Sequence, residues 1–233
     1  DVWMSKCPML RNLRFQGLSS LDNVGNKWMH KCGSLQTPDF DGLGNLRTVK
    51  SQWMSKCAVL QTPVFDGLGK LYEVEDCWMF ECPLLRDPWF QGLSSLNRVG
   101  WNWMSRCDSI QSPNFDGLGM LETVGTGWMR NCGMLQNPKF NGLGNLNNVG
   151  DRWLSGCAIL QTPVFDGLRN LKIVGDDWLS RCPILRNPRF RGLSSLNSVG
   201  EDWMYDCHSL QSPDFDGLGN LLTFESDWME TLG

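Results

Sequence analysis

The chain has 233 residues, of which 41% are hydrophobic and 20% charged, and its formal net charge at neutral pH is −4. No run of basic residues is present, which argues against a nucleic-acid partner, because binding to phosphates needs clustered Lys and Arg. No stretch reaches the ~20 apolar residues of a membrane span, so membrane insertion is not expected.

The sequence repeats every 25 residues without insertion or deletion. Tryptophan recurs once per repeat from Trp3 to Trp228, and cysteine follows four residues later nine times, from Cys7 to Cys207. A fixed period in this range is typical of a solenoid, in which each repeat is one coil that buries its apolar face against its neighbours. We therefore predict a single solenoid domain over residues 1–233, made of nine coils and a degenerate partial coil at the C-terminus. The chain begins without Met and in mid-pattern, so we expect a mature product or a fragment of a longer array.

The elements expected within one coil can be followed along residues 176–200, whose positions are numbered 1 to 25. Apolar residues at positions 3, 4 and 7 fit one helical face and follow a capping residue, which predicts one or two helical turns. Positions 10 to 15 read L-x-x-P-x-F and predict a short extended segment. Position 17 is always Gly and predicts a turn, because Gly tolerates positive φ. Leu at 18 and 21 predicts another short turn, and positions 21 to 25, L-x-x-V-G, a second extended piece.

Proline occupies position 13 in eight of nine coils, with Leu13 as the exception. Because proline cannot donate a hydrogen bond to a strand ladder, the sheet on this side should be short or interrupted and should begin only after the proline.

The unit C-x-x-L-x-x-P-x-F-x-G-L-x-x-L-x-x-V-G-x-x-W-M-x-x-C resembles the BspA-like (treponemal type) leucine-rich repeat. Residues 185–190 match the strand positions of that repeat, and residues 196–200 match its V-x-x-I-G segment. Cys182 and Cys207 match its bracketing cysteines, whereas Trp203 and Met204 stand where the family has Ala-Phe. The repeat is two residues longer, and proline replaces an aliphatic strand residue. The resemblance implies an α/β repeat fold, a leucine-rich-repeat-like right-handed solenoid with short strands and short helical turns. It also implies a protein of the cell surface or extracellular space with a role in adhesion or protein binding.

The periodic residues are interpreted as core rather than as sites of chemistry. Nine regularly spaced cysteines suit small buried hydrophobes better than disulfides or a metal site, and the tryptophan column suits a core ladder. Cys77 lies outside the cysteine column and is expected to be exposed. An aspartate row at position 16 would suit calcium, but we interpret it as repeated turn residues. No catalytic motif is present, so neither an enzyme nor a cofactor is expected.

A partner is expected to bind through position 14, the least constrained column. It runs through Arg14, Asp39, Val64, Trp89, Asn114, Lys139, Val164, Arg189 and Asp214. Such variation is typical of a recognition surface and equally of an unconstrained solvated face. A large aromatic such as Trp89 is a candidate hot spot for binding.

The main hypothesis is a non-enzymatic scaffold that binds a protein or glycan through this row. The alternative is a structural solenoid that assembles into a fibre or surface layer, either end to end or laterally through an apolar self-association patch of Cys77, Phe80 and Trp101. Positions 1 and 5 would lie one helical turn apart, which would bring Phe80 and Trp101 together.

Overall fold

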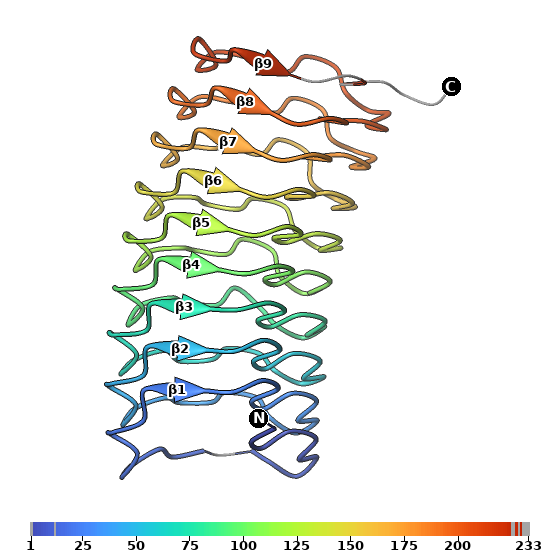
Figure 1. The fold of residues 1–233 in the computed structure, drawn as a ribbon. Coiled ribbons are helices and arrows are strands. Elements are labelled where there is room, and N and C mark those ends of the chain that lie inside the picture. Colours follow the sequence, from blue (N-terminus) through green and yellow to red (C-terminus); the bar gives the residue numbers. More distant parts are fainter. Residues whose placement is uncertain (1, 12, 225–226, 228, 230–233) are drawn as a thin grey trace.

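The structure is a computed structural model that describes residues 2–11, 13–224, 227 and 229. These residues form an elongated stack of coils, one above the next, with a single parallel sheet along one side (Figure 1). The part of the predicted C-terminal partial coil beyond these residues is outside the described chain.

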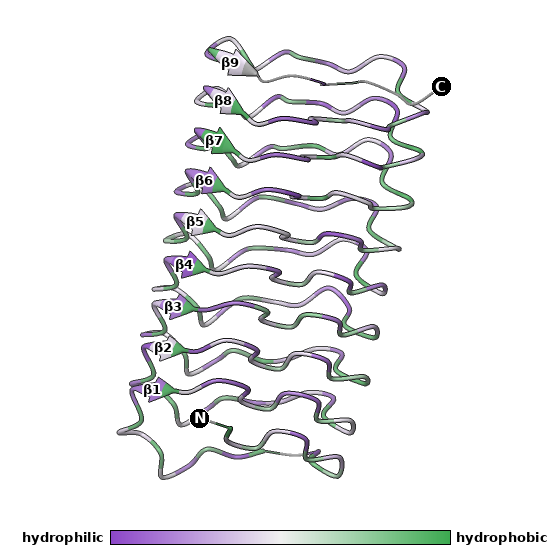
Figure 2. Ribbon diagram, turned by 45° about the vertical axis from the view of Figure 1, so that its right-hand side comes forward, coloured by the Kyte–Doolittle hydropathy of each residue, from purple (hydrophilic) through white to green (hydrophobic). Residues whose placement is uncertain are grey.

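One regular strand per coil builds this sheet, in the order of the sequence. Each strand is two residues long and lies at coil positions 23 and 24: β1 (Asn23–Val24), β2 (Thr48–Val49), β3 (Glu73–Val74), β4 (Arg98–Val99), β5 (Thr123–Val124), β6 (Asn148–Val149), β7 (Ile173–Val174), β8 (Ser198–Val199) and β9 (Thr223–Phe224). All eight pairings are parallel, and each joins residues 25 apart. From β1 to β8 the valine is buried, and most arrows in Figure 2 change from hydrophilic to hydrophobic along their length.

The predicted helical turns are wrong: no helix occurs among the described residues. In residues 1 to 6 of the coil, hereafter the corner segment, positions 2, 4 and 6 have positive φ in almost every coil, as in Lys27 (64°), Met29 (54°) and Lys31 (56°). The residues between them do not, so left-handed residues alternate with residues of negative φ. The spacing of 3, 4 and 7 still buries Trp28, Met29 and Cys32.

The alternation directs the backbone amides of the corner segment toward both neighbouring coils. The amide of Met29 donates to the carbonyl of Trp3 in the preceding coil at 3.3 Å, whereas those of Lys27 and Lys31 donate to the following coil at 2.8 and 2.9 Å. A helix would instead pair its amides within one coil. The corner segment therefore exchanges bonds within the coil for bonds that link it to the coils above and below.

Residue types in the corner segment agree with this backbone. A residue that is branched at Cβ rarely adopts a positive φ, and none of the residues with positive φ in the described coils is Val, Ile or Thr. Val2 stands at position 2 of the first coil, and its φ is not positive.

The second side of the coil contains the interrupted sheet that the proline predicts. Only isolated parallel bridges form there, all at position 14, for example between Asp39 and Val64 and between Trp89 and Asn114. The amide of Val64 donates to the carbonyl of Pro38 at 3.0 Å, whereas Pro63 before it has no amide hydrogen and donates no ladder bond.

The turn after this side requires glycine. Gly117 has φ of 100°, and a Cβ there would lie 2.5 Å from the carbonyl oxygen of Phe90 in the preceding coil. The prediction of a glycine turn at position 17 is confirmed.

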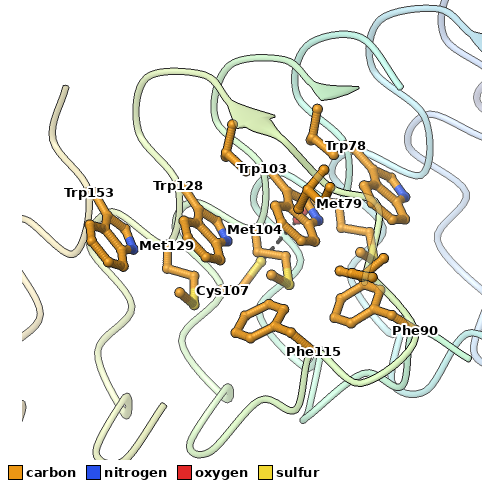
Figure 3. Close-up of a cluster of buried hydrophobic side chains, with 14 of the residues drawn as sticks. Trp78, Met79, Phe90, Trp103, Met104, Cys107, Phe115, Trp128, Met129 and Trp153 are labelled. Carbon is orange, nitrogen blue, oxygen red and sulfur yellow. Dashed lines mark hydrogen bonds between the residues drawn. The ribbon is translucent and has the colours of Figure 1, made fainter. Parts of the chain in front are cut away.

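The core consists of columns of identical residues along the stack (Figure 3). Adjacent indoles from Trp28 to Trp178 lie 5.2–5.4 Å apart with planes within 6°. The phenylalanines of position 15 stack beside them and meet them edge to face, as Phe115 meets Trp128 at 5.2 Å. Seven of these buried indole N–H groups have no hydrogen-bond acceptor among the described residues: Trp28, Trp53, Trp78, Trp103, Trp128, Trp153 and Trp178.

Candidate binding surfaces

The position-14 row lies on the outside of the coil, between two buried columns. Its side chains are exposed except for the half-buried Asn114 and Asp214, whereas the flanking prolines and phenylalanines are buried through most of the stack. The short bridges therefore fix the backbone of the row while its side chains vary freely.

The most exposed apolar residue of this row is Trp89, which is 64% exposed. Val64 lies beside it in the preceding coil and is 42% exposed. The two residues line an open hollow of about 310 Å³ together with Asp66, Asp87 and Gln91. A hollow of this size accommodates one side chain or one sugar ring.

The polar wall of this hollow is held in place by backbone bonds. The Oδ1 atom of Asp87 accepts hydrogen bonds from the amides of Gln111 at 3.0 Å and Ser112 at 2.7 Å. A carboxylate fixed in this way keeps its second oxygen in a constant orientation.

Charged residues elsewhere on the row pair with neighbouring coils. Arg191, at position 16 of its coil, lies 3.7 Å from Asp214 and 3.4 Å from Asp216. These exposed pairs relieve the repulsion between neighbouring carboxylates of the aspartate row, and each contributes ~0–1 kcal/mol to the stability of the fold.

The second predicted surface, Cys77, Phe80 and Trp101, lies on the corner segment. The amide of Cys77 donates to the carbonyl of Trp101 at 2.6 Å, and the indole of Trp101 is 62% exposed. Phe80 is half-buried, and the ammonium of Lys56 lies 5.6 Å from its ring centroid. The ring contacts of the described residues include none between Phe80 and Trp101, because without a helix positions 1 and 5 are not stacked by one turn.

The expectation that Cys77 is exposed is also incorrect, since the residue is half-buried. Burial raises the pKa of its thiol, which lowers the fraction of the nucleophilic thiolate.

Sequence reasoning missed a second hollow on the corner segment. About 380 Å³ in volume, it is lined by Trp101, Asn102, Thr126, Arg130, Arg152 and their neighbours. Burial, followed by the charges of Arg152 and Arg106, lowers the pKa of Arg130, and its Nε atom is buried without a partner. The signal was available: arginine stands at position 5, where most coils have serine.

The cysteine column behaves as core. Its members are free thiols. From Cys32 onward they are buried, and each of these donates to a backbone carbonyl of the preceding coil, as Cys107 does to Met79 at 3.0 Å. Burial raises the pKa of Cys57 and of Cys157 to about 12. Among the described residues, no group of three or more His, Cys, Asp or Glu side chains could hold a metal ion.

The coil geometry defines the molecule as a parallel β-solenoid. No protein-family model and no curated protein match the chain. Among solved structures, a leucine-rich repeat protein from Bacteroides ovatus is similar, with 15% sequence identity and a TM-score of 0.39 over 97% of this chain and 79% of that chain. Within the part of the chain that the structure describes, no helix is long and apolar enough to cross a membrane.

Proposed function

We propose that the chain is a non-enzymatic scaffold of the BspA-like leucine-rich-repeat type, which binds a protein or glycan partner through the position-14 row. The observation that supports this most is the hollow at Trp89. An exposed indole, a neighbouring valine and a fixed carboxylate meet on a rigid surface whose side chains vary from coil to coil.

The energetics of recognition favour such a place. Exposed tryptophans on a preorganised surface supply a large contact area at a small entropic cost and are enriched among hot spots. A position at the cell surface or outside the cell, with a role in adhesion, belongs to the same proposal and rests on the resemblance of the repeat.

The test is a binding screen of the purified chain against an immobilised glycan array and a displayed peptide library. Trp89→Ser should abolish the binding found, whereas Lys139→Ser, two coils further along the same row, should reduce it only modestly. Binding that Trp89→Ser leaves unchanged would place the site elsewhere on the molecule.

The second candidate function is self-association through the corner segment. It is favoured by the exposed indole of Trp101 beside the hollow at Arg130. Trp101→Ser should then lower the mass in solution, whereas Trp89→Ser should not.

A further inference from the structure

The outward-facing residues of the corner segments form a continuous strip along the stack, on the side to which the strand arrows point in Figure 1. This strip, the corner face, comprises coil positions 1, 2 and 6, together with the partly exposed Arg130 at position 5, a position that is buried in most coils. Its charge changes sign from one end to the other: in sequence the first three coils carry Asp1, Lys6, Lys27, Lys31 and Lys56, whereas the eighth and ninth carry Asp176, Arg181, Glu201, Asp202 and Asp206, with Asp177 buried beneath them.

The basic end is crowded and mostly unpaired. Lys6, Lys27 and Lys31 are exposed, and none of them forms an ion pair with a described residue. Lys56 pairs with Glu81 at 3.0 Å. Burial, and then the charges of these four lysines, lower the pKa of His30, which shows that they converge on one place.

The acidic end mirrors this arrangement at the same coil positions. Burial, and then the charges of Asp177 and Asp227, raise the pKa of Asp202, as expected for carboxylates held close together. Asp177 pairs with Arg152 at 3.3 Å. Among the described residues, Glu201 and Asp202 form no ion pair.

Between the two ends the charges of the corner face cancel. Asp76, Glu81 and Asp151 balance Arg106, Arg130 and Arg152. In the middle, in the fifth of the nine coils, stands the exposed indole of Trp101, at the edge of the hollow that contains Arg130.

A strip that is basic at one end, neutral in the middle and acidic at the other is complementary to itself when reversed. A parallel copy would place lysine against lysine. An antiparallel copy places the first coil opposite the ninth and the second opposite the eighth, and the fourth coil, with Asp76 and Glu81, opposite the sixth, with Arg130. Trp101 then lies opposite its own equivalent, on the two-fold axis, as an isologous interface requires.

We propose that the chain forms an antiparallel two-fold dimer through the corner face, with Trp101 at its centre. The proposal rests on self-association, the second candidate function, and gives it a geometry. The position-14 row lies on a different part of the coil, so a dimer of this kind leaves the hollow at Trp89 accessible.

The test uses charge reversals that the repeat already accepts. Lys27→Asp with Lys31→Asp introduces at positions 2 and 6 the residues found there in Asp202 and Asp206, and Asp202→Lys with Asp206→Lys does the reverse. The control, Arg14→Asp with Arg189→Asp, makes the same change of net charge on the position-14 row, where Asp39 stands naturally. Sedimentation equilibrium at low and high salt gives the mass of each chain.

The wild type and the control should be dimers, which high salt weakens by screening. Each corner-face variant alone should dimerise at least about tenfold more weakly, because charge pairs become like-charge contacts. An equimolar mixture of Lys6→Asp and Asp206→Lys, which stand at position 6 of the first and ninth coils that face each other in the antiparallel arrangement, should restore the dimer that each of these two variants weakens alone. A monomeric wild type at all concentrations, or a dimer that neither reversal weakens, would overturn the proposal.

Cross-linking separates the antiparallel dimer from end-to-end association. Arg106→Cys lies in the central coil beside Trp101 and, in a Cys7→Ser and Cys77→Ser background that removes the two accessible thiols, should link to its equivalent with a short bismaleimide. End-to-end copies would hold these residues about 40 Å apart, because nine coils advance by roughly 4.8 Å each. A dimer without this cross-link, or one that grows into longer assemblies, would contradict the two-fold arrangement. Trp89→Ser, which tests the proposed partner site, should leave mass and cross-link unchanged.

Discussion

Alkaline pH should destabilise the fold through the buried thiols. Burial raises the pKa of Cys157 to about 12 in the folded chain, from an ordinary value of 9.0. Between these values the unfolded chain releases a proton that the folded chain keeps, so this thiol's contribution is complete below about pH 9 and is lost as the pH rises. The slope is ~1.4 kcal/mol per pH unit for each such thiol, which gives a loss of about 2 kcal/mol at pH 10.5.

The assay compares the wild type with Cys157→Ala by urea unfolding in a reducing buffer at pH 7.5 and 10.5. Alanine removes the titrating group without leaving a buried hydroxyl, and lysines and tyrosines ionise equally in both chains. The wild type should therefore lose about 2 kcal/mol more than the variant between the two pH values. If both chains lose the same free energy of unfolding, the thiol ionises while folded and the reasoning fails.

Three further predictions concern the backbone and the thiols. Met104→Val should lower the free energy of unfolding, measured with urea, by more than about 2 kcal/mol, because a β-branched residue resists the φ of 52° at this position. Met104→Leu should lower it by less than about 1.5 kcal/mol, because leucine already stands at this position in two coils. Gly117→Ala should lower the midpoint of thermal unfolding by several degrees, whereas Gly119→Ala, whose Cβ would meet nothing within 4 Å, should leave it nearly unchanged. In thiol labelling of the native chain at pH 7.5, Cys77 and Cys7 should react before the other cysteines, which should follow only on unfolding; uniform labelling of all thiols would show that the coils open readily.

The parts of the fold that depend on the identity of repeated residues were predictable. A side chain that recurs every 25 residues must meet its own copy in the next coil, so the columns headed by Trp28 and Cys32 could be assigned to the core. The invariant glycine and the proline likewise specified the turn and the interrupted sheet, because each restricts the backbone in one definite way.

The corner segment was mispredicted because apolar spacing reports which side chains are buried and not how the backbone turns between them. Positions 3, 4 and 7 are buried by a helix and by an alternating backbone alike. The absence of β-branched residues at positions 2, 4 and 6 of the nine full coils, with Val2 as the informative exception, is the sequence signal for the observed conformation.

The candidate sites were partly predictable for a related reason. Exposure of Trp89 follows from its column, but the cluster of Lys6, Lys27 and Lys31 joins different positions of successive coils. Such residues are 4 to 25 apart in sequence, so no basic run reveals them. Only the stacking of the coils brings them together.

The tryptophan ladder also gives the molecule an optical property. Indoles 5.2–5.4 Å apart and nearly parallel exchange excitation energy faster than they emit it, so light absorbed at Trp53 can be emitted many coils away. Because equivalent indoles are nearly parallel, this transfer should leave the emission polarised when the rod itself is immobilised. A single quencher placed beside one coil should darken much of the stack, which makes the emission of the intact protein a measure of how many coils remain in register.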